Sequence, residues 1–478
     1  MPIISISRAI AENAERDPDR PAITCGDDTV TRIELERRTN RIARALAELG
    51  VGEGRYVTLA LPNSVAFYEA ALAIWKLGAT PQPVSWRLPD RERREIVELA
   101  DSPVVVGAEP DAHPGRQVLP LGWEPDPTID DTPLPDVIAP HWKAPTSGGS
   151  TGRPKLIVAA DPGTVDTESP GLGQRRDGVV LIPGPLYHNA PFSFGSTGLF
   201  HGNHLVLLPH FDAEAALAAI EHHQVDWTLM VPTMMSRILR LPLAVRERYD
   251  LSSLQVLWHM AAPCPPWVKD GWCEWIGGEK VYELYAGTEA QAVTVIRGDE
   301  WQAHRGSVGR CVTGEIRILD PDTYTELPRG EQGEVFMRND RATYEYLGAE
   351  ARLSPDGWES LGDMGSMDAD GYLYLSDRRG DMILSGGANI YPAEVELALS
   401  EHPAMVSCAV IGLPDEDLGS RIHAIVQMSH PVADDELRSF LAERLVRYKI
   451  PRTFEHVDEM VRDDAGKVRR SALRDERM

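Results

Sequence analysis

Apolar residues recur at near-helical intervals close to the start of the chain. They do so between residues 35 and 49, where leucine and isoleucine return on one face of a predicted helix. Thr31 and Glu34 precede this stretch at the spacing of a capping box, and Gly50 follows it as a stop. The same pattern predicts a second helix over residues 65–77.

Short unbroken apolar runs alternate with these helical patterns. A further helix is predicted over 213–223, with Asp212 as its N-cap. Strands that alternate with helices are typical of layered α/β architecture with largely parallel sheets. We therefore expect an α/β fold whose strands include the runs 57–61, 179–182, 205–208, 228–231 and 256–258.

The pattern changes near residue 378. The last hundred or so residues favour a small, separate α+β unit, so we expect a large domain over 1–377 and a small mobile domain over 378–478. The predicted elements of the small domain are helices at 394–400 and 436–445 and strands at 409–411 and 423–427.

Two segments carry little pattern. Residues 110–145 are rich in proline and aspartate and are predicted to form a long surface connection. The highly charged residues 469–478 are expected to fray.

Charge excludes one class of function. Among 478 residues, 48 are Lys or Arg and 73 are Asp or Glu, which gives a net charge of −25. Nucleic-acid binding needs a basic surface, so it is not expected here.

The sequence carries no targeting or membrane signal. The N-terminus lacks the apolar stretch of a signal peptide, and no apolar run approaches the length of a membrane helix. We therefore expect a cytoplasmic protein that does not enter a membrane. The scattered, odd set of cysteines indicates neither a disulfide framework nor a zinc site: Cys25, Cys264, Cys273, Cys311 and Cys408.

A cluster of glycines, hydroxyls and one lysine follows the proline-rich connection. Small residues let backbone N–H groups approach a phosphate, hydroxyls donate to its oxygens, and a lysine compensates its charge. The spacing is not that of a Walker loop, and taken alone the segment fits a Gly/Ser-rich surface loop equally well. Its residues are Thr146, Ser147, Gly148, Gly149, Ser150, Thr151, Gly152, Arg153, Pro154 and Lys155.

Later segments make the phosphate interpretation specific. They are Tyr285-Ala286-Gly287-Thr288-Glu289, the run 357–363 that ends in Asp363, Asp377-Arg378 followed by Ser385-Gly386-Gly387, and finally Gly466-Lys467. In this order and spacing the chain resembles the adenylate-forming superfamily, which includes acyl-CoA synthetases, peptide-synthetase adenylation domains and beetle luciferases. The resemblance covers nearly the whole chain and is strongest to bacterial acid–CoA ligases of the 4-coumarate and bile-acid type.

The resemblance implies sites for ATP and Mg²⁺. The 146–155 loop would hold the β- and γ-phosphates, and Glu289 would help to bind Mg²⁺. Further roles are implied for Tyr285 and Ala261-Ala262-Pro263 along adenine, Thr288 at the α-phosphate, Asp363 at the ribose hydroxyls, and Arg378 near the ribose and phosphates.

Three positions depart from the family pattern. Gly148 stands where a serine is usual, and Leu156 replaces the glycine after Lys155. Ala286 replaces another glycine, which we expect to narrow the nucleotide pocket slightly.

The resemblance also implies an acyl site. Pro185-Leu186-Tyr187-His188 matches a block whose histidine lies near the acid's carboxylate and the thioester tunnel. Residues 189–194 offer no aspartate to hold an α-ammonium, which argues against amino-acid substrates. The implied pocket is mostly apolar and predicts an aromatic or alicyclic monocarboxylic acid. Its residues are Asn189, Phe192, Phe194, His259, Met260, Gly287 and Val293.

Two arrangements of the small domain are implied for such enzymes. One presents Lys467 to the carboxylate and α-phosphate during adenylation. The other presents the segment 385–390 and opens a pantetheine tunnel for coenzyme A. The hinge position, usually Asp or Lys, is Gly380 here. Glycine absorbs large backbone changes without steric cost, so rotation is still expected.

Together these features predict an ATP- and Mg²⁺-dependent carboxylic acid–CoA ligase, acting as a monomer or homodimer. Two alternatives stay open at this point. An amide synthetase would pass the same acyl-adenylate to an amine, and a non-enzymatic relative would bind nucleotide as a regulator.

Overall fold

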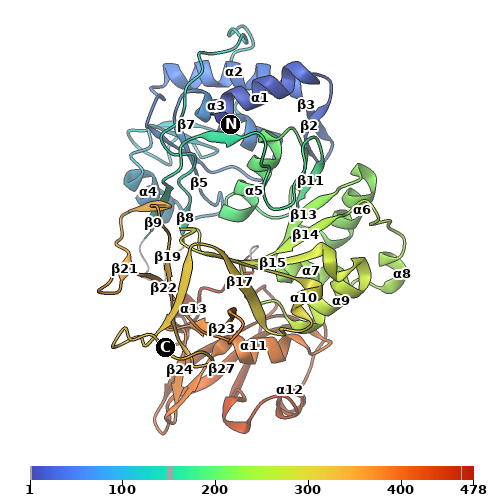
Figure 1. The fold of residues 1–478 in the computed structure, drawn as a ribbon, viewed down its shortest axis with the longest axis vertical. Coiled ribbons are helices and arrows are strands. Elements are labelled where there is room, and N and C mark those ends of the chain that lie inside the picture. Colours follow the sequence, from blue (N-terminus) through green and yellow to red (C-terminus); the bar gives the residue numbers. More distant parts are fainter. Residues whose placement is uncertain (1–2, 148–153, 464–465) are drawn as a thin grey trace.

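The computed structural model describes residues 3–147, 154–463 and 466–478. The phosphate-loop residues Gly148 to Arg153 therefore lie outside the described residues. Helices of the N-terminal third occupy one end of the molecule, and the C-terminal residues form a smaller body at the other (Figure 1).

A fourteen-stranded sheet runs through the large part of the molecule. Six neighbouring strands are parallel, as the sequence predicted, and β3 (Asp28–Thr31) closes their edge antiparallel to β2. In order across the sheet they are β2 (Pro21–Cys25), β12 (His204–Leu207), β11 (Val179–Ile182), β13 (Trp227–Met230), β14 (Val256–His259) and β15 (Val281–Tyr285).

Beyond β15 the same sheet becomes antiparallel, which the sequence did not predict. These strands pair antiparallel with their neighbours, whether the connection is a short turn, the short helix α10 (Gly298–Trp301) or a longer stretch of chain. They are β16 (Val293–Arg297), β17 (Ser307–Thr313), β23 (Tyr372–Arg378), β22 (Glu359–Met367), with β21 (Arg352–Leu353) on its flank, β19 (Gly333–Arg338) and β18 (Glu315–Leu319).

A second, parallel sheet lies in the N-terminal third. Its order is β5 (Thr80–Pro83), β4 (Tyr56–Leu59), β6 (Val104–Val106) and β7 (Gln117–Leu119). Strand β7 interrupts the expected connection 110–145, which is otherwise irregular. The helices of this region are α1 (Ile6–Arg16), α2 (Arg32–Glu48), α3 (Val65–Lys76) and α4 (Asp90–Leu99).

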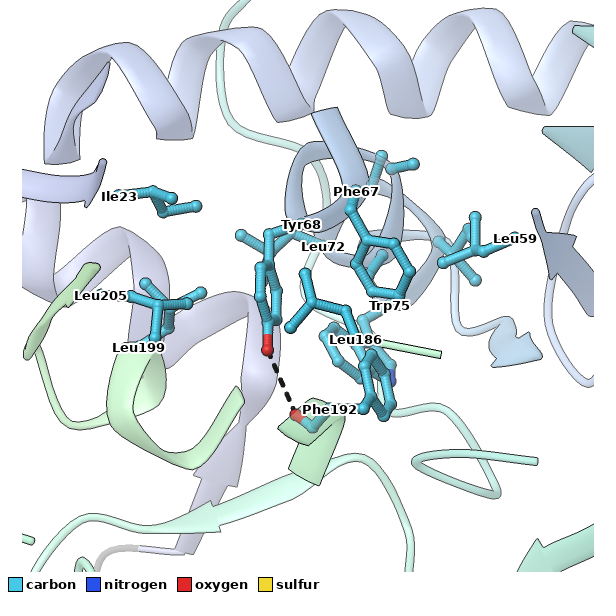
Figure 2. Packing of buried hydrophobic residues seen from close by; sticks show 14 of the residues in the cluster. Ile23, Leu59, Phe67, Tyr68, Leu72, Trp75, Leu186, Phe192, Leu199 and Leu205 are labelled. Carbon is cyan, nitrogen blue, oxygen red and sulfur yellow. Dashed lines mark hydrogen bonds between the residues drawn. The ribbon is translucent and has the colours of Figure 1, made fainter. Parts of the chain in front are cut away.

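The start of α2 confirms the predicted capping box. The Thr31 hydroxyl accepts from the Glu34 amide, and the Glu34 carboxylate accepts from the Thr31 amide at 2.9 Å. Helix α3 differs because it is buried on nearly all sides, and its Phe67, Tyr68 and Trp75 form an aromatic core with α5 (Asn189–Phe200) (Figure 2).

Helices on the other face of the parallel strands enclose a second core. They are α6 (Ala213–His223), α7 (Pro232–Leu239), α8 (Leu243–Arg246) and α9 (Pro266–Ile276). The bounds of α6 and its Asp212 cap are as predicted, and Asp212 accepts from the Ala215 amide at 2.8 Å.

The small C-terminal body has a core of its own. Its long ladder joins β26 (Met405–Asp415) to β27 (Gly419–Met428), with β28 (Thr453–His456) parallel to β27. Both long strands extend well beyond the apolar runs that predicted them, because ladder bonds continue into polar residues. Its other elements are the hairpin β24 (Ile383–Ser385) and β25 (Ala388–Ile390), α11 (Pro392–Ser400) and α12 (Asp434–Ala442).

The expectation that residues 469–478 fray is wrong. Residues Arg470–Asp475 form helix α13, and Arg470 bonds both Glu396 and Asp381 at 2.9 Å. Arg477 forms a two-pronged bond to Glu455. The charges that suggested fraying are used in ion pairs.

None of the described helices is long and apolar enough to cross a membrane.

Candidate active site

The two strands that flank the phosphate loop form an antiparallel hairpin ladder. Strand β8 (Thr146–Ser147) pairs with β9 (Lys155–Ala159), so Ser147 lies opposite Lys155. Strand β20 (Tyr344–Leu347) pairs with the other edge of β9. Gln82 donates to the Thr146 hydroxyl at 2.9 Å, which anchors the start of the loop. The two ladders fix both ends of the loop in space.

A buried carboxylate faces this hairpin. Glu289 is 5% exposed, and Lys155 Nζ lies 3.4 Å from its Oε1. The hydroxyl of Tyr346 donates to the same oxygen, while the Lys155 ammonium lies 3.9 Å from the centre of the Tyr346 ring. Burial and this bond raise the pKa of Tyr346, so its proton stays on the phenol.

The Glu289 carboxylate fits a hard cation. Both side-chain donors among the described residues reach Oε1, so Oε2 is the oxygen that an ion can take. One carboxylate oxygen together with nucleotide oxygens and waters is a normal magnesium arrangement. No group of three or more His, Cys, Asp or Glu within the described ranges forms a complete protein cage for a metal.

A second cluster joins Tyr285, Asp363 and Arg378. The Tyr285 hydroxyl donates to Asp363 Oδ2 at 2.7 Å, and Arg378 Nε lies 3.3 Å from Oδ1. Asp363 and Arg378 are also direct partners in the β22–β23 ladder. Burial, and next the Asp363 charge, raise the pKa of Tyr285. The structure thus brings together three residues that the sequence assigned to the nucleoside.

Backbone strain marks the predicted adenine segment. Ala261, just after β14, has φ 74°, a left-handed conformation that costs a residue with a Cβ about 1–3 kcal/mol. Ala261, Ala262 and Pro263 are exposed or half-buried, so they form a surface rather than core. Thr288 and Ala286 are half-buried on the loop that follows β15.

Gly287, on the same loop, leaves no room for a side chain, because neighbouring side chains approach its backbone closely. A Cβ there would meet Leu361 Cδ1 at 2.3 Å and Glu289 Oε2 at 2.9 Å. A side chain would therefore displace the carboxylate that faces the phosphate hairpin.

Lys467 reaches this site from the small domain. Burial lowers the pKa of Lys467, and the nearby Asp463 carboxylate opposes this shift. The charge of Arg378 lowers the pKa further, and that of Glu289 raises it. The backbone of Lys467 is fixed by a turn in which its amide donates to Asp463 Oδ1 at 2.8 Å. The Lys467 side chain is therefore within electrostatic range of Glu289 and Arg378.

Ser385, Gly386 and Gly387 are not part of this cluster. They form the β24–β25 turn, where Gly386 and Gly387 have φ 56° and 81°, and Gly386 donates to Leu418 O at 2.9 Å. These contacts stay within the small domain, so they can persist in the arrangement that presents the segment 385–390 for thioester formation.

Gly380 lies between two anchors. The Arg379 amide donates to Gly362 O at 2.8 Å, and its guanidinium lies 2.9 Å from Asp322, both in the large domain. Asp381 is bonded instead by Arg470. A Cβ at Gly380 would touch nothing within 4 Å.

The predicted acyl-site residues at and within α5 point in different directions. His188 is the N-cap of this helix, and its ring is tilted against that of Tyr187, with ring centres 4.5 Å apart. Phe194 points toward the sheet, where its ring centre lies 5.9 Å from that of Trp227. Phe192 is fully buried, and its ring is stacked with those of Tyr68 and Trp142, so it belongs to the core and not to a pocket surface. Figure 2 shows it in this core with Tyr68 and Trp75.

His259 and Asn189 also face away from the expected pocket. On β14, Trp258 and Met260 pack with the α5 core, whereas His259 lies near Glu283 and Lys269 with the helices of the other face. Burial lowers the pKa of His259 well below its usual range. Asn189 accepts from Lys143. Val293 and Met260 keep positions compatible with a pocket wall.

Two residues of the site were not predicted from the sequence. Tyr346 is placed by the β20–β9 ladder, whose pairing has no short-range signal. Lys143 is buried against α5, where Ser193 accepts from it at 2.7 Å, and burial lowers its pKa to about 7. Only its position before the phosphate loop could have drawn attention to it.

A cavity of about 110 Å³ is lined by Tyr187, the residue that precedes His188. Aromatic and basic side chains border it, and the small domain contributes Asp463. Among its lining residues are Trp86, Arg87, Tyr187, Phe211, Arg237 and Asp463.

Known proteins are similar to this chain in sequence and in fold. Residues 10–347 match the family AMP-binding enzyme, and residues 394–467 match the AMP-binding enzyme C-terminal domain. Feruloyl-CoA synthase from Amycolatopsis sp is 31% identical over 485 residues, covering 96% of each chain.

Two solved structures are similar over the whole length. One is o-succinylbenzoate CoA synthetase from Bacillus subtilis in complex with its acyl-adenylate intermediate (26% identity, TM-score 0.83, 99% of this chain and 98% of that chain). The other is an amide bond synthetase from Marinactinospora thermotolerans (26% identity, TM-score 0.81, 99% and 100%). The predictions of an adenylate-forming fold and of an AMP-forming acid–CoA ligase are confirmed. The chain belongs to the AMP-binding enzyme family.

Proposed function

We propose that this protein joins an aromatic or alicyclic monocarboxylic acid to coenzyme A in two steps at one site. The observation that carries the proposal is a chain of contacts between segments that lie far apart in sequence. Lys155 meets Glu289, Lys467 is within electrostatic reach of Glu289 and Arg378, and Arg378 meets Asp363.

In the first step a carboxylate oxygen attacks the α-phosphorus of ATP. Pyrophosphate leaves with the electron pair of the broken P–O bond, and an acyl-adenylate remains. Negative charge grows on the phosphate oxygens, so fixed cations stabilise this transition state. Lys155, Arg378 and Lys467 supply them, while Asp363 holds the ribose through its two oxygens.

Mg²⁺, when bound, neutralises phosphate charge; Glu289 is the residue that holds it, with Thr288 beside the α-phosphate. In the second step the thiolate of coenzyme A attacks the acyl carbon, and AMP leaves. The thiol proton passes to solvent. His188, at the start of α5, is placed beside the acid's carboxylate for both steps.

The cavity lined by Tyr187 suits coenzyme A. Arg87 and Arg237 bring positive charge for phosphates, and Tyr187 and Phe211 offer apolar surface. Arg87→Ala should raise the KM for coenzyme A severalfold and leave acid-dependent ATP–pyrophosphate exchange unchanged. A rise in the KM for ATP instead would contradict this assignment.

Partly buried apolar side chains support the choice of acid. Several pack against the α5 core without being enclosed, and they carry no charge to pair with a second carboxylate. They include Leu172, Ala190, Phe194, Tyr282, Leu284 and Val295. Feruloyl and succinylbenzoyl groups, named for the two CoA-dependent relatives above, are both aromatic. Succinylbenzoate carries a second carboxylate, for which these apolar side chains offer no partner, so the support extends to the ring and not to the number of carboxylates.

We further propose that the two domains are 1–377 and 378–478, and that the enzyme is a cytoplasmic monomer or homodimer. At the boundary, Asp377 accepts from Ala393 at the start of α11, while Arg378 pairs with Asp363 of the large domain. Contacts with both bodies therefore meet at the proposed boundary.

The test is a panel of acids assayed for AMP release with and without coenzyme A. We expect the highest kcat/KM among benzoate-, cinnamate- and ring-fused acids, with acetate and phenylalanine lowest. Acid-dependent ATP–pyrophosphate exchange excludes a regulator. AMP release that responds to amines but not to coenzyme A would establish the amide synthetase alternative, which the amide bond synthetase relative keeps relevant.

A further inference from the structure

The end of α7 makes a direct bond between the two domains. Arg240, the residue after this helix, extends its guanidinium to the small domain. Its Nη1 donates to Pro403 O at 2.7 Å, and its Nη2 donates to Ser400 O at 2.9 Å. Ser400 ends α11, and Pro403 lies in the segment that follows the helix.

The chemistry of that helix end explains the contact. The last carbonyls of an α-helix have no partner inside the helix and carry partial negative charge. Ser400 is the last residue of α11. A guanidinium presents its donors in a fixed fork, so one side chain can bond this helix-end carbonyl and the Pro403 carbonyl together.

Arg240 is oriented from the large domain. Its guanidinium lies 4.9 Å from the centre of the Trp267 ring, and its Nε lies 3.4 Å from the Ser236 hydroxyl. Ser236 belongs to α7 and Trp267 to α9, two helices of one core. The arginine is therefore aimed at α11 by groups that do not move with the small domain.

We propose that Arg240 is a positioning residue for adenylation: it latches the end of α11 and so holds the small domain where Lys467 faces Glu289 and Arg378. The inference rests on the proposed function, in which Lys467 serves the first step and not the second. Arg240 touches neither substrate nor Lys467, so its effect passes through the orientation of the whole small domain.

The expected effect is moderate. The two bonds are exposed to solvent, and a cation at an exposed helix end stabilises it only weakly. Removal should lower the population of the lysine-facing arrangement, and with it the adenylation rate, by about 3- to 10-fold.

The experiment separates the two half-reactions in Arg240→Ala and Arg240→Lys. Adenylation is followed by acid-dependent ATP–pyrophosphate exchange, and thioester formation by the conversion of supplied acyl-adenylate with coenzyme A. We expect Arg240→Ala to lower exchange about 3- to 10-fold and to leave thioester formation unchanged or faster. The lysine variant, which keeps one charged donor, should fall between Arg240→Ala and the wild type.

Arg246→Ala is the matched control. Arg246 lies in the same region, with its guanidinium over the Trp275 ring and its Nε bonded to Leu241 O, all within the large domain. It should leave both half-reactions near wild type. Equal losses in both half-reactions of Arg240→Ala, or an unchanged exchange rate, would overturn the latch.

Lys467→Ala distinguishes failure of the latch from failure of the proposed function. We expect it to abolish exchange and to spare thioester formation. Normal exchange in Lys467→Ala would refute the role assigned to that lysine itself. Loss of exchange in Lys467→Ala together with normal exchange in Arg240→Ala would refute the latch alone.

Discussion

At the scale of single residues, the orientation of the buried Glu289 carboxylate depends on the phenol of Tyr346. Tyr346 donates to Glu289 Oε1, which also faces Lys155. Removing the hydroxyl frees the carboxylate to turn, and a hydrogen bond to a charged group contributes about 1.5–3 kcal/mol. We expect Tyr346→Phe to raise the KM for Mg-ATP about tenfold or more, with weaker nucleotide binding by calorimetry in the presence of Mg²⁺.

Tyr344 on the same strand provides the control. Its hydroxyl donates to Glu359 at 2.6 Å rather than to Glu289. Tyr344→Phe should leave the Mg-ATP dependence near wild type. If both variants changed it equally, the effect would come from the strand and not from the bond to Glu289.

Lys143 is expected to make stability depend on pH. Burial lowers its pKa to about 7 in the folded protein, whereas an unfolded lysine titrates near 10.4. Between these values the unfolded chain binds more protons, so the free energy of unfolding rises with pH, by at most roughly 1.4 kcal/mol per unit. Below pH 7 the full cost of burying the charge is present.

Lys143→Met removes this dependence. Asn189 and Ser193 can still pair with each other, since their side-chain oxygens lie 3.3 Å apart. Urea unfolding at pH 6.5 and 9.5 should show a stability gain from the substitution that is larger at pH 6.5. A gain or loss that is the same at both pH values would show that the buried amine is not the cause.

At the scale of elements, Phe192 and Phe194 of α5 have different roles. Phe192 is fully buried among aromatic rings, so Phe192→Ala should cost about 3–5 kcal/mol of unfolding free energy and leave the preference among acids unchanged. Phe194→Ala should cost less and change the ratio of kcat/KM between cinnamate-like acids and octanoate. Unfolding curves and acid profiles of the two variants check this, and a changed acid profile for Phe192→Ala would contradict it.

This contrast shows what the sequence can predict. The periodicity of α6 and the Thr31–Glu34 capping box depend on neighbours a few residues apart, and both were predicted correctly. The direction in which the Phe192 or His259 side chain points depends on which element packs on which side of its helix or strand. The periodicity of apolar residues does not carry that information. The motifs identified Glu289, Asp363 and Lys467, but only the β20–β9 ladder brought Tyr346 beside Glu289.

At the scale of the whole molecule, the proposed hinge residue Gly380 lies between two anchors. Arg379 is bound to Asp322 and Asp381 to Arg470, on opposite domains. Gly380→Pro fixes φ and should hinder rotation without meeting any neighbouring side chain. We expect one half-reaction to slow far more than the other while the melting temperature stays near wild type, and unchanged rates in both would show that the pivot lies elsewhere.

The pairing of Asp363 with Arg378 has a consequence for the fate of the intermediate. The ladder that holds the ribose-binding carboxylate continues to the backbone of Arg379, and the chain becomes free to pivot only at the next residue. Asp363 and Arg378, which we propose to bind the nucleotide half of the acyl-adenylate, would therefore stay with the large domain while the small one rotates. An enzyme with this layout can keep hold of a reactive mixed anhydride through the change of partner, and we expect little of it to escape into water before the thiol arrives.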